Sequence, residues 1–338
     1  MIWQVIWFIL WGVLWAVYFT LDGFDLGLGT LMPFLAKDET EKRIVYNAMG
    51  PFWDGNEVWL ITAGGATFAA FPKTYAVMFS TLYSPLLLIL FALILRGVSF
   101  EFRGKSDGET WKKIWDGCLV FGSFLPALLF GVAFANIFKG IPFDKAGMYH
   151  GNILKLLNLY GIVGGVFFVL IFMMHGALWL WVKSEGELSL RAKNMASKLW
   201  VAVLVFAVIF MGYSKFATRL WENYFNHPLL FILPLIAVVS LIMVKLNLSK
   251  DDKLKSWLFS ALTIFFATYW GVAGLFPNLF PSSIDPSASL TIYNSSSSKT
   301  TLIIMTVVAL IFVPLVIGYQ FWAYKKFIHP VKVEDLEY

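Results

Sequence analysis

The stretch 21-LDGFDLGLG-29 is the most informative about the fold, because it places two aspartates inside a long apolar run. No charged side chain precedes Asp22, and after Asp25 the apolar run resumes and continues through Leu35. A helix needs about 20 apolar residues to cross the hydrocarbon core of a bilayer. The sequence therefore predicts a first membrane span, Ile2–Leu35, with two carboxyl groups near its far end.

The composition of the whole chain agrees with a membrane protein. Of the 338 residues, 59% are hydrophobic and only 14% are charged, whereas soluble chains carry about a quarter charged residues. The single cysteine, Cys118, excludes a disulfide framework and a cysteine-based metal site within this chain. The net charge of +5 comes from lysines in short loops and implies no nucleic-acid partner. These features predict an all-α polytopic membrane protein.

Further apolar runs predict a total of nine transmembrane helices. The longest connection, 276-FPNLFPSSIDPSASLTIYNSSSSK-299, fits an ordered cap or a mobile loop equally well. The nine expected spans are Ile2–Leu35, Pro51–Phe71, Tyr75–Leu95, Ile114–Phe138, Leu157–Val182, Ser197–Tyr213, Pro228–Val244, Trp257–Phe276 and Thr301–Tyr324.

The positions of the basic residues predict the orientation. Most of the 26 Lys and Arg residues follow odd-numbered spans or lie in the C-terminal tail. Because cytoplasmic loops are enriched in Lys and Arg, we expect the N-terminus outside and the C-terminus in the cytoplasm.

Several acids are expected to meet at the cytoplasmic ends of the first four spans. Asp22 lies about 28 Å along the first helix from Trp3, at 1.5 Å per residue. The second span begins on the inner side with 51-PFWDGNEVW-59. The polar residues expected at this level are Asp22, Asp25, Asp54, Glu57, Arg96 and Asp116.

The spacing of these acids admits two interpretations. Asp22 and Asp25 are three residues apart, as are Asp54 and Glu57, so each pair shares a helix face. Burial and a neighbouring acid both favour the protonated form of a carboxyl group, so such a group of acids could pass protons. Alternatively, the acids are solvated at the interface, cap helices, or are neutralised by Arg96 as a structural pair.

Glycines in the first two spans predict close helix packing. Gly23 and Gly27 are four residues apart, and 62-TAGGATFAA-70 offers a face with small side chains. Such faces let helices approach closely in lipid, so we expect the first two spans to pack tightly against each other.

Nothing in the sequence indicates that this chain alone holds a redox cofactor or a metal. Haem usually needs an axial His, Met or Cys, and only His175 among the four histidines lies within an expected span. A lone membrane histidine more often hydrogen-bonds to a neighbour. No P-loop, GxGxxG motif or metal-spaced cluster is present.

Taken together, these residues resemble subunit II of the cytochrome bd-type quinol oxidases. The matching stretches extend along the whole chain. They are 22-DGFDLGLG-29, 51-PFWDGNEVWLITAGGATFAAFP-72, 131-GVAFAN-136, 184-SEGELSLRA-192 and 276-FPNLFPSS-283, followed by 288-ASLT-291 and the serine run.

The resemblance implies an architecture of two four-helix bundles plus one peripheral helix. In this sequence the bundles would be residues 1–138 and 157–276, and the ninth helix residues 300–326, within one transmembrane domain, 1–338. It also implies a bacterial cytoplasmic membrane, a subunit I that ligates haem b and haem d, quinol as substrate, and a small single-helix accessory subunit. Some members of the family hold a structural quinone or lipid in subunit II.

The resemblance further implies roles for individual residues. Asp25 and Asp54 match positions implicated in proton delivery toward the haems, and Asp22 and Glu57 are their expected neighbours on that path. Trp59 matches a position near an oxygen-entry route in some members. The expected structural neighbours are Trp53, Asn56, Arg96, Glu101 and Asp116. No residue of this chain is expected to be catalytic.

Three function hypotheses therefore stand at this point. The first is a non-haem subunit of a quinol:oxygen oxidoreductase that stabilises the haem subunit and supplies part of a cytoplasmic proton path. The second is an ion-coupled secondary transporter, which paired intramembrane acids would suit. The third is a passive scaffold subunit without a proton role.

Overall fold

The computed structural model describes residues 1–337 and is helical along most of that length. The helices are α1 (Ile2–Leu35), α2 (Glu39–Met49), α3 (Trp53–Ala70), α4 (Pro72–Thr81), α5 (Tyr83–Phe102), α6 (Glu109–Lys139), α7 (Ile153–Leu156), α8 (Leu159–Lys183), α9 (Gly186–Ala217), α10 (Leu220–Asn226), α11 (Ile232–Ser249), α12 (Lys253–Leu275) and α13 (Lys299–Phe327). Short 3-10 turns occupy η1 (Arg103–Lys105), η2 (Pro228–Phe231), η3 (Pro286–Ala288) and η4 (Val333–Asp335).

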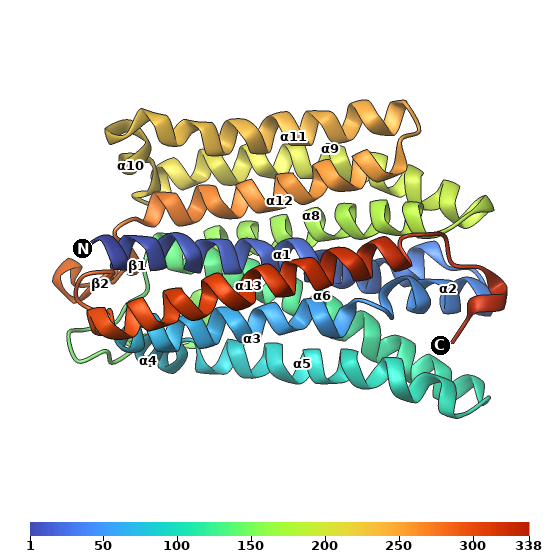
Figure 1. Ribbon diagram of the computed structural model, residues 1–338, viewed down its shortest axis with the longest axis horizontal. Coiled ribbons are helices and arrows are strands. Elements are labelled where there is room, and N and C mark those ends of the chain that lie inside the picture. The colour runs from blue at the N-terminus through green and yellow to red at the C-terminus, as the bar shows by residue number, and fades with distance from the viewer. Residues whose placement is uncertain (338) are drawn as a thin grey trace.

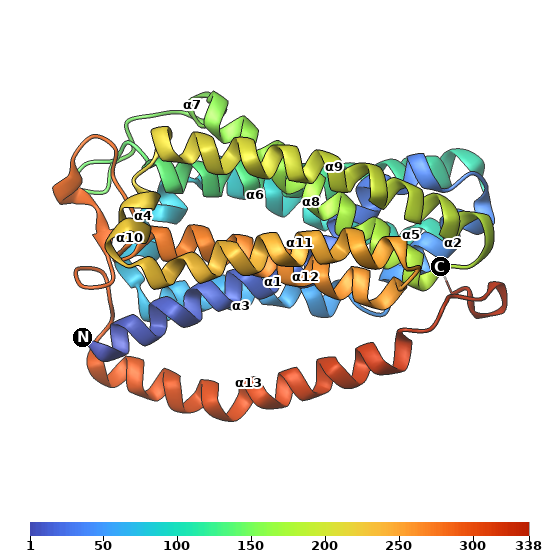
Figure 2. The ribbon, with the colours of Figure 1, turned by 90° about the horizontal axis from the view of Figure 1, so that it is seen from above.

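The long helices run roughly side by side, and the two ends of the chain lie at opposite ends of the molecule (Figure 1). Helices α8, α9, α11 and α12 lie on one side, and α3, α5 and α6 lie on the other. Helix α1 packs against α3, α6, α8 and α12 and so joins the two groups. Helix α13 runs along the edge of the molecule, apart from the rest over its middle portion (Figure 2).

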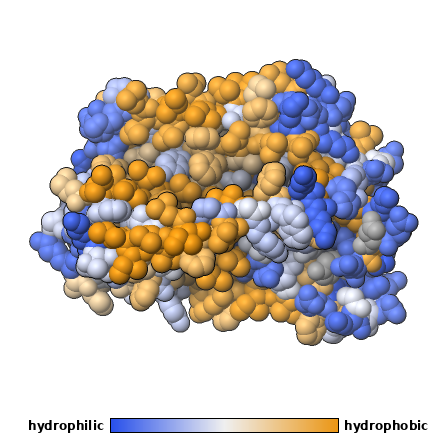
Figure 3. All heavy atoms as spheres, in the orientation of Figure 1, coloured by the Kyte–Doolittle hydropathy of each residue, from blue (hydrophilic) through white to orange (hydrophobic). Residues whose placement is uncertain are grey.

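Within the described residues, eight helical segments are long and apolar enough to cross a membrane. They are Ile2–Leu35, Tyr83–Lys105, Glu109–Lys139, Leu159–Lys183, Gly186–Ala217, Pro228–Ser249, Lys253–Leu275 and Lys299–Phe327. The predicted all-α polytopic membrane protein is confirmed. In Figure 3 apolar residues form a broad band across the middle of the visible face, with hydrophilic residues toward both ends.

The second expected span, Pro51–Phe71, corresponds to α3. This helix has 18 residues, packs against α1, and is less apolar than the eight segments because Asp54 and Glu57 lie in its first two turns. It ends where Pro72 begins α4, since a proline disfavours the helical conformation of the residue before it.

The third expected span, Tyr75–Leu95, is divided between two helices. Helix α4 ends at Thr81, and α5 begins at Tyr83 and continues to Phe102. Pro85 stands in the first turn of α5 and has no N–H to donate to the carbonyl of Thr81, so a continuous helix through Leu82 would lack that hydrogen bond. The prediction of one uninterrupted helix from Tyr75 was therefore wrong.

The closest helix crossing involves α1 and α8. A Cβ atom on Gly27 would lie 1.7 Å from the carbonyl oxygen of Phe172, and one on Gly176 would lie 2.3 Å from the backbone nitrogen of Leu28. Gly23 faces the ring of Phe172 as well. The first two expected spans, α1 and α3, do pack against each other as predicted. Gly23 and Gly27, however, admit the fifth expected span, α8.

The connection from 276 to 299 is an ordered cap at the end that carries the N-terminus. Strands β1 (Asn278–Phe280) and β2 (Leu290–Thr291) pair antiparallel, with Asn278 opposite Thr291. The backbone N–H of Ser297 donates to the carbonyl of Ala70 at 2.8 Å, and Thr74 donates to the hydroxyl of Ser295 at 2.8 Å. Of the two alternatives that the sequence left open, the ordered cap is the observed one.

Candidate functional site

Two buried carboxyl groups lie side by side along α1. Asp22 is 0% exposed and Asp25 is 1% exposed. A carboxylate at this depth must find polar partners, because lipid and apolar side chains cannot replace its hydration. Those partners come from α5 for Asp22 and from α3 for Asp25.

Arg96 on α5 joins Asp22 to a second acid. Its Nη2 donates to Oδ1 of Asp22 at 2.8 Å and to Oε2 of Glu57, on α3, at 2.9 Å. The Arg96 side chain is 1% exposed and that of Glu57 is 24% exposed. One guanidinium nitrogen therefore connects a fully buried acid to an acid near the surface.

Asp25 has a separate set of contacts. Its Oδ2 accepts a hydrogen bond of 2.8 Å from Nδ2 of Asn56 on α3. The Oδ1 of Asn56 in turn accepts from the hydroxyl of Tyr324 on α13, at 3.2 Å. Because Tyr324 stands one turn before the end of α13, this cluster lies toward the end of the molecule where the C-terminus is found.

Several buried polar atoms around these acids have no hydrogen-bond partner within the described residues. They include Oδ2 of Asp22, Oδ1 of Asp25, the Tyr18 hydroxyl, and Nε and Nη1 of Arg96. Buried polar atoms are usually satisfied by protein or by ordered water. Polar atoms of this kind are positions where internal water can bind.

A groove between α3 and α5 leads to the cluster from the surface. It encloses about 310 Å³ and is lined by Trp53, Asp54 and Glu57 together with apolar residues of both helices. Asp54 is exposed in this groove. Trp53 forms one wall and stacks on Phe100, with ring centroids 5.0 Å apart.

The remaining expected residues lie around this centre. Trp59 is buried on α3 at 7% exposure. Glu101 is exposed near the end of α5. Asp116 is not part of the Arg96 group, because it accepts from Nε of Arg103 at 2.6 Å and from Lys42 at 2.8 Å.

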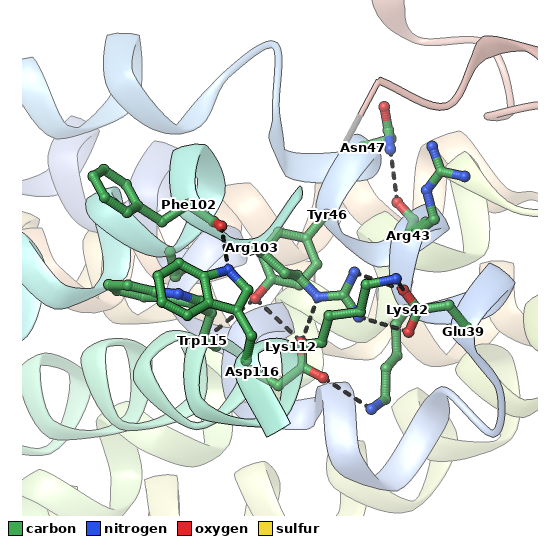
Figure 4. A network of polar contacts seen from close by, with 12 residues as sticks. Glu39, Lys42, Arg43, Tyr46, Asn47, Phe102, Arg103, Lys112, Trp115 and Asp116 are labelled. Carbon is green, nitrogen blue, oxygen red and sulfur yellow. Dashed lines mark hydrogen bonds and ion pairs between the residues drawn. The ribbon is translucent and has the colours of Figure 1, made fainter. Parts of the chain in front are cut away.

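Asp116 belongs to a second polar network, formed by α2, η1 and α6 (Figure 4). Arg103 also holds Glu39 through two nitrogens, at 3.0 and 2.9 Å. Burial acts to raise the pKa of Glu39, but hydrogen bonds and charge from Arg103 and Lys112 outweigh it and lower that pKa below its ordinary value. These fixed pairs tie α2 to the ends of α5 and α6, so the network is structural.

Sequence reasoning missed α2 and the contribution of Tyr324. A local signal for α2 was present, since 38-DETE-41 has the form of a capping box, and Asp38 accepts from the backbone N–H of Glu41 at 2.9 Å. The contact of Tyr324 with Asn56 joins residues 268 positions apart. No local pattern could have revealed it.

His175 has both ring nitrogens engaged within the fold. Nδ1 lies 2.5 Å from the Ser260 hydroxyl, and Nε2 lies 3.1 Å from the carbonyl oxygen of Thr20. The ring also stacks on Trp257. This residue does not fit an axial haem ligand. Within residues 1–337, no group of three or more His, Cys, Asp or Glu is placed to hold a metal ion.

Comparison with known proteins gives consistent matches over nearly the whole chain. A family described as cytochrome bd terminal oxidase subunit II matches residues 3–327. The cytochrome bd ubiquinol oxidase subunit 2 of Bacillus subtilis is 38% identical, covering 92% of this chain and 91% of that protein. The cytochrome bd-I ubiquinol oxidase subunit 2 of Escherichia coli is 37% identical, covering 94% and 92%.

A solved structure shows the same fold. A chain of the bd oxidase from Geobacillus thermodenitrificans superposes with a TM-score of 0.80, covering 97% of this chain and 99% of the other, at 17% sequence identity. Coverage of this extent leaves no large segment of either chain unmatched. The protein is thus a multi-pass membrane subunit of a terminal oxidase, an oxidoreductase, and it belongs to the cytochrome bd terminal oxidase subunit II family.

Proposed function

We propose that this chain is the non-haem subunit of a quinol:oxygen oxidoreductase in the bacterial cytoplasmic membrane. The complex reduces oxygen to water with electrons from quinol and builds a proton gradient by vectorial chemistry. This chain stabilises the haem-bearing subunit and supplies part of a cytoplasmic proton path. The relatives named above support the reaction, and the buried acids support the proton path.

The proposed topology has nine crossings, with α3 as the additional one. An odd number of crossings puts the two ends of the chain on opposite sides, and the ends do lie at opposite ends of the molecule. The concentration of Lys and Arg near the C-terminal end favours that end as cytoplasmic. Two four-helix bundles, α1 with α3, α5 and α6, and α8 with α9, α11 and α12, leave α13 as the peripheral helix.

The cofactors of the proposed complex lie in the partner. Subunit I would ligate haem b and haem d and bind the quinol, and a small single-helix subunit would complete the assembly. When bound there, the haems supply the electron transfer and the oxygen chemistry. A structural quinone or lipid is the one non-protein component that we assign to this chain.

The proposed proton path runs through Asp22 and Asp25 to the groove that Asp54 and Glu57 line. Its central part is the ion bridge of Asp22, Arg96 and Glu57. Because both carboxylates share one guanidinium, the protonation of one acid leaves the other to balance the positive charge of Arg96. Buried polar atoms without protein partners are the atoms that bind internal water. Water at Oδ2 of Asp22 and Oδ1 of Asp25 would connect the two acids.

The groove between α3 and α5 is the proposed exit toward the haem subunit. Asp54 is exposed on the flank of the molecule, and a carboxylate facing lipid near this depth is costly. A partner that covers this flank removes that cost. The small-residue face 62-TAGGATFAA-70 adjoins it, and Gly65 has open space beside it, so a second chain can approach closely. Trp59 lies on the same helix, where we place the proposed oxygen route.

The single observation that carries the proposal is the bridge from buried Asp22 through Arg96 to Glu57 at the groove. The test is the rate of oxygen reduction by the assembled complex with Asp54→Asn or Asp25→Asn. Both changes should slow turnover by tenfold or more, on the scale typical of lost proton transfer, and leave the haem spectrum intact. Asp107→Asn, an exposed acid after η1, is the matched control.

The competing functions predict different results. A passive scaffold predicts normal turnover in both variants, and that outcome would sink the proton path. A secondary transporter predicts a functional single chain without haem, so ion uptake by the isolated chain in vesicles would favour it. The matches to oxidase subunits weigh against the transporter.

A further inference from the structure

Asn56 on α3 has a hydrogen-bond partner for each polar group of its amide. Its Nδ2 donates to Oδ2 of Asp25 at 2.8 Å and to the carbonyl of Leu21 at 3.2 Å. Its Oδ1 accepts from the hydroxyl of Tyr324 at 3.2 Å. An amide nitrogen only donates and an amide oxygen only accepts. The reverse orientation of the amide would therefore turn its oxygen toward two other acceptors, and the three bonds together hold it as observed.

The bond from Asn56 also makes the two oxygens of Asp25 unequal. Oδ2 faces an amide N–H, which can donate a hydrogen bond but cannot take up or supply a proton. Oδ1 is buried and has no hydrogen-bond partner within the described residues, so it is the oxygen to which internal water can bind. A proton that reaches or leaves Asp25 therefore uses Oδ1.

Tyr324 comes from α13, the helix whose middle portion lies apart from the rest (Figure 2). Near its C-terminal end this helix is nevertheless fixed. The ring of Tyr324 packs on those of Phe52 and Trp257, with centroids 4.6 and 6.0 Å apart. Just after α13 ends, Nζ of Lys183 donates to the carbonyl of His329 at 2.8 Å. These contacts keep the tyrosine hydroxyl next to the amide.

We propose that Tyr324 is a positioning residue of the proton path. By donating to Oδ1 of Asn56, it keeps the amide nitrogen on Oδ2 of Asp25, and Oδ1 of Asp25 is then the oxygen that takes up and releases the proton. Neither Tyr324 nor Asn56 carries the proton itself. The inference rests on the proposed role of Asp25 in the proton path and extends that role to one named oxygen and to a residue of the peripheral helix.

The first test is oxygen reduction by the assembled complex with Tyr324→Phe, which keeps the ring and its packing and removes only the donor. Turnover should fall about threefold to tenfold, the scale of one lost hydrogen bond. The ratio of rates in H2O and D2O should rise, because proton transfer at Asp25 then limits the reaction. Tyr319→Phe, an exposed tyrosine of the same helix, is the matched control and should change neither quantity.

A double variant separates positioning from packing. If Tyr324 acts through Asp25, Tyr324→Phe should have no further effect on the residual turnover of Asp25→Asn, because the oxygen that it positions is already lost. A contribution through packing alone would slow both backgrounds by the same factor, and that result would overturn the proposal. Unchanged turnover and an unchanged isotope effect in Tyr324→Phe would also overturn it.

Asn56→Leu tests the same hydrogen bonds from the other side. This variant removes the donor to Asp25 and should slow turnover at least as much as Tyr324→Phe. Adding Tyr324→Phe to it should slow turnover no further, because the amide through which Tyr324 acts is absent. Multiplied effects of the two changes would contradict the proposal.

The results also separate this inference from the proposed function. Normal turnover with Asp25→Asn would overturn the proton path and this inference with it. Slow turnover with Asp25→Asn but normal turnover with Tyr324→Phe would overturn only the positioning role of Tyr324 and leave the proton path standing.

Discussion

The arrangement around Arg96 shows how a charged group can be kept inside the membrane part of a protein. The guanidinium contacts one buried acid and one acid near the surface. Removing two ions from water costs several kcal/mol per ion unless the geometry compensates for it. The ion bridge therefore need not stabilise the folded protein. It does restrict the positions inside the protein at which a carboxylate can keep its negative charge.

Loss of Arg96 should destabilise the protein strongly. In Arg96→Gln, Asp22 keeps its burial but loses its cationic partner, and breaking a buried pair in this way costs about 3–5 kcal/mol. The double variant Asp22→Asn, Arg96→Gln should lose less than the sum of the single changes, because position 22 is then neutral and no longer needs a cationic partner. Thermal unfolding of the purified complex measures both effects.

The control for this prediction is Arg219→Gln. Arg219 pairs with Glu222, but both side chains are largely exposed, and such pairs contribute about 0–1 kcal/mol. If Arg96→Gln were as mild as Arg219→Gln, the buried charge at Asp22 would have found another partner, and the ion bridge proposed here would be wrong.

Sequence spacing predicted which helix carries the two buried acids, but not which residues on other helices contact them. The three-residue spacing of Asp22 and Asp25 correctly indicated one helix carrying both acids into the interior. Their different partners, Arg96 for one and Asn56 for the other, depend on how four helices meet. Asp116 looked equivalent from its position, yet the neighbouring Arg103 and Lys42 hold it elsewhere.

At the scale of helices, the crossing of α1 and α8 is the feature most sensitive to side-chain size. Gly27→Ala would place a methyl group 1.7 Å from the Phe172 carbonyl oxygen, so the helices must separate. Overpacking of this kind costs about 1–3 kcal/mol. We expect a lower melting temperature and, because Asp22 and Asp25 lie on the same helix, slower oxygen reduction.

Gly212→Ala provides the opposite case. Gly212 lies within α9 with no atom within 4 Å of a Cβ placed there, so the substitution should be neutral or stabilise by up to about 1 kcal/mol through helix propensity. Opposite signs for the two Gly→Ala changes would support the crossing. A neutral Gly27→Ala would show that α1 and α8 are not held this closely.

The helix boundaries show where apolar length alone fails as a guide. Apolar runs correctly indicated the long helices, because crossing a bilayer requires a minimum length. The break at Leu82 was decided by Pro85, and α2 by the capping box at Asp38, which are local backbone effects that hydropathy does not record. The packing of the α1 glycines on α8 was decided by tertiary contacts between segments far apart in the chain.

For the whole molecule, the distribution of exposed apolar surface agrees with a subunit that is surrounded by lipid and by another protein chain. Helix α13 is apolar, yet only 6% of its most apolar 18-residue stretch is buried. Large hydrophobic residues on α5 and α9 are also exposed. In water such surface would favour association. In the membrane such surface meets lipid or a second subunit, and we propose that the protein partner covers the flank with the groove at Asp54.

The haem content of the complex tests whether the partner subunit, and not this chain, supplies the haem ligands. Both ring nitrogens of His175 are already bonded to Ser260 and Thr20, so we expect the chain expressed alone to lack a haem absorption band. His175→Gln in the full complex should leave the amount of haem per assembled complex unchanged, although loss of the bond to Ser260 or Thr20 should reduce the yield of assembled protein. A pyridine haemochrome assay on intact complex, normalised to both subunits, gives the ratio. Complex that assembles with less haem per subunit would place a ligand in this chain and contradict the assignment of the haems to its partner.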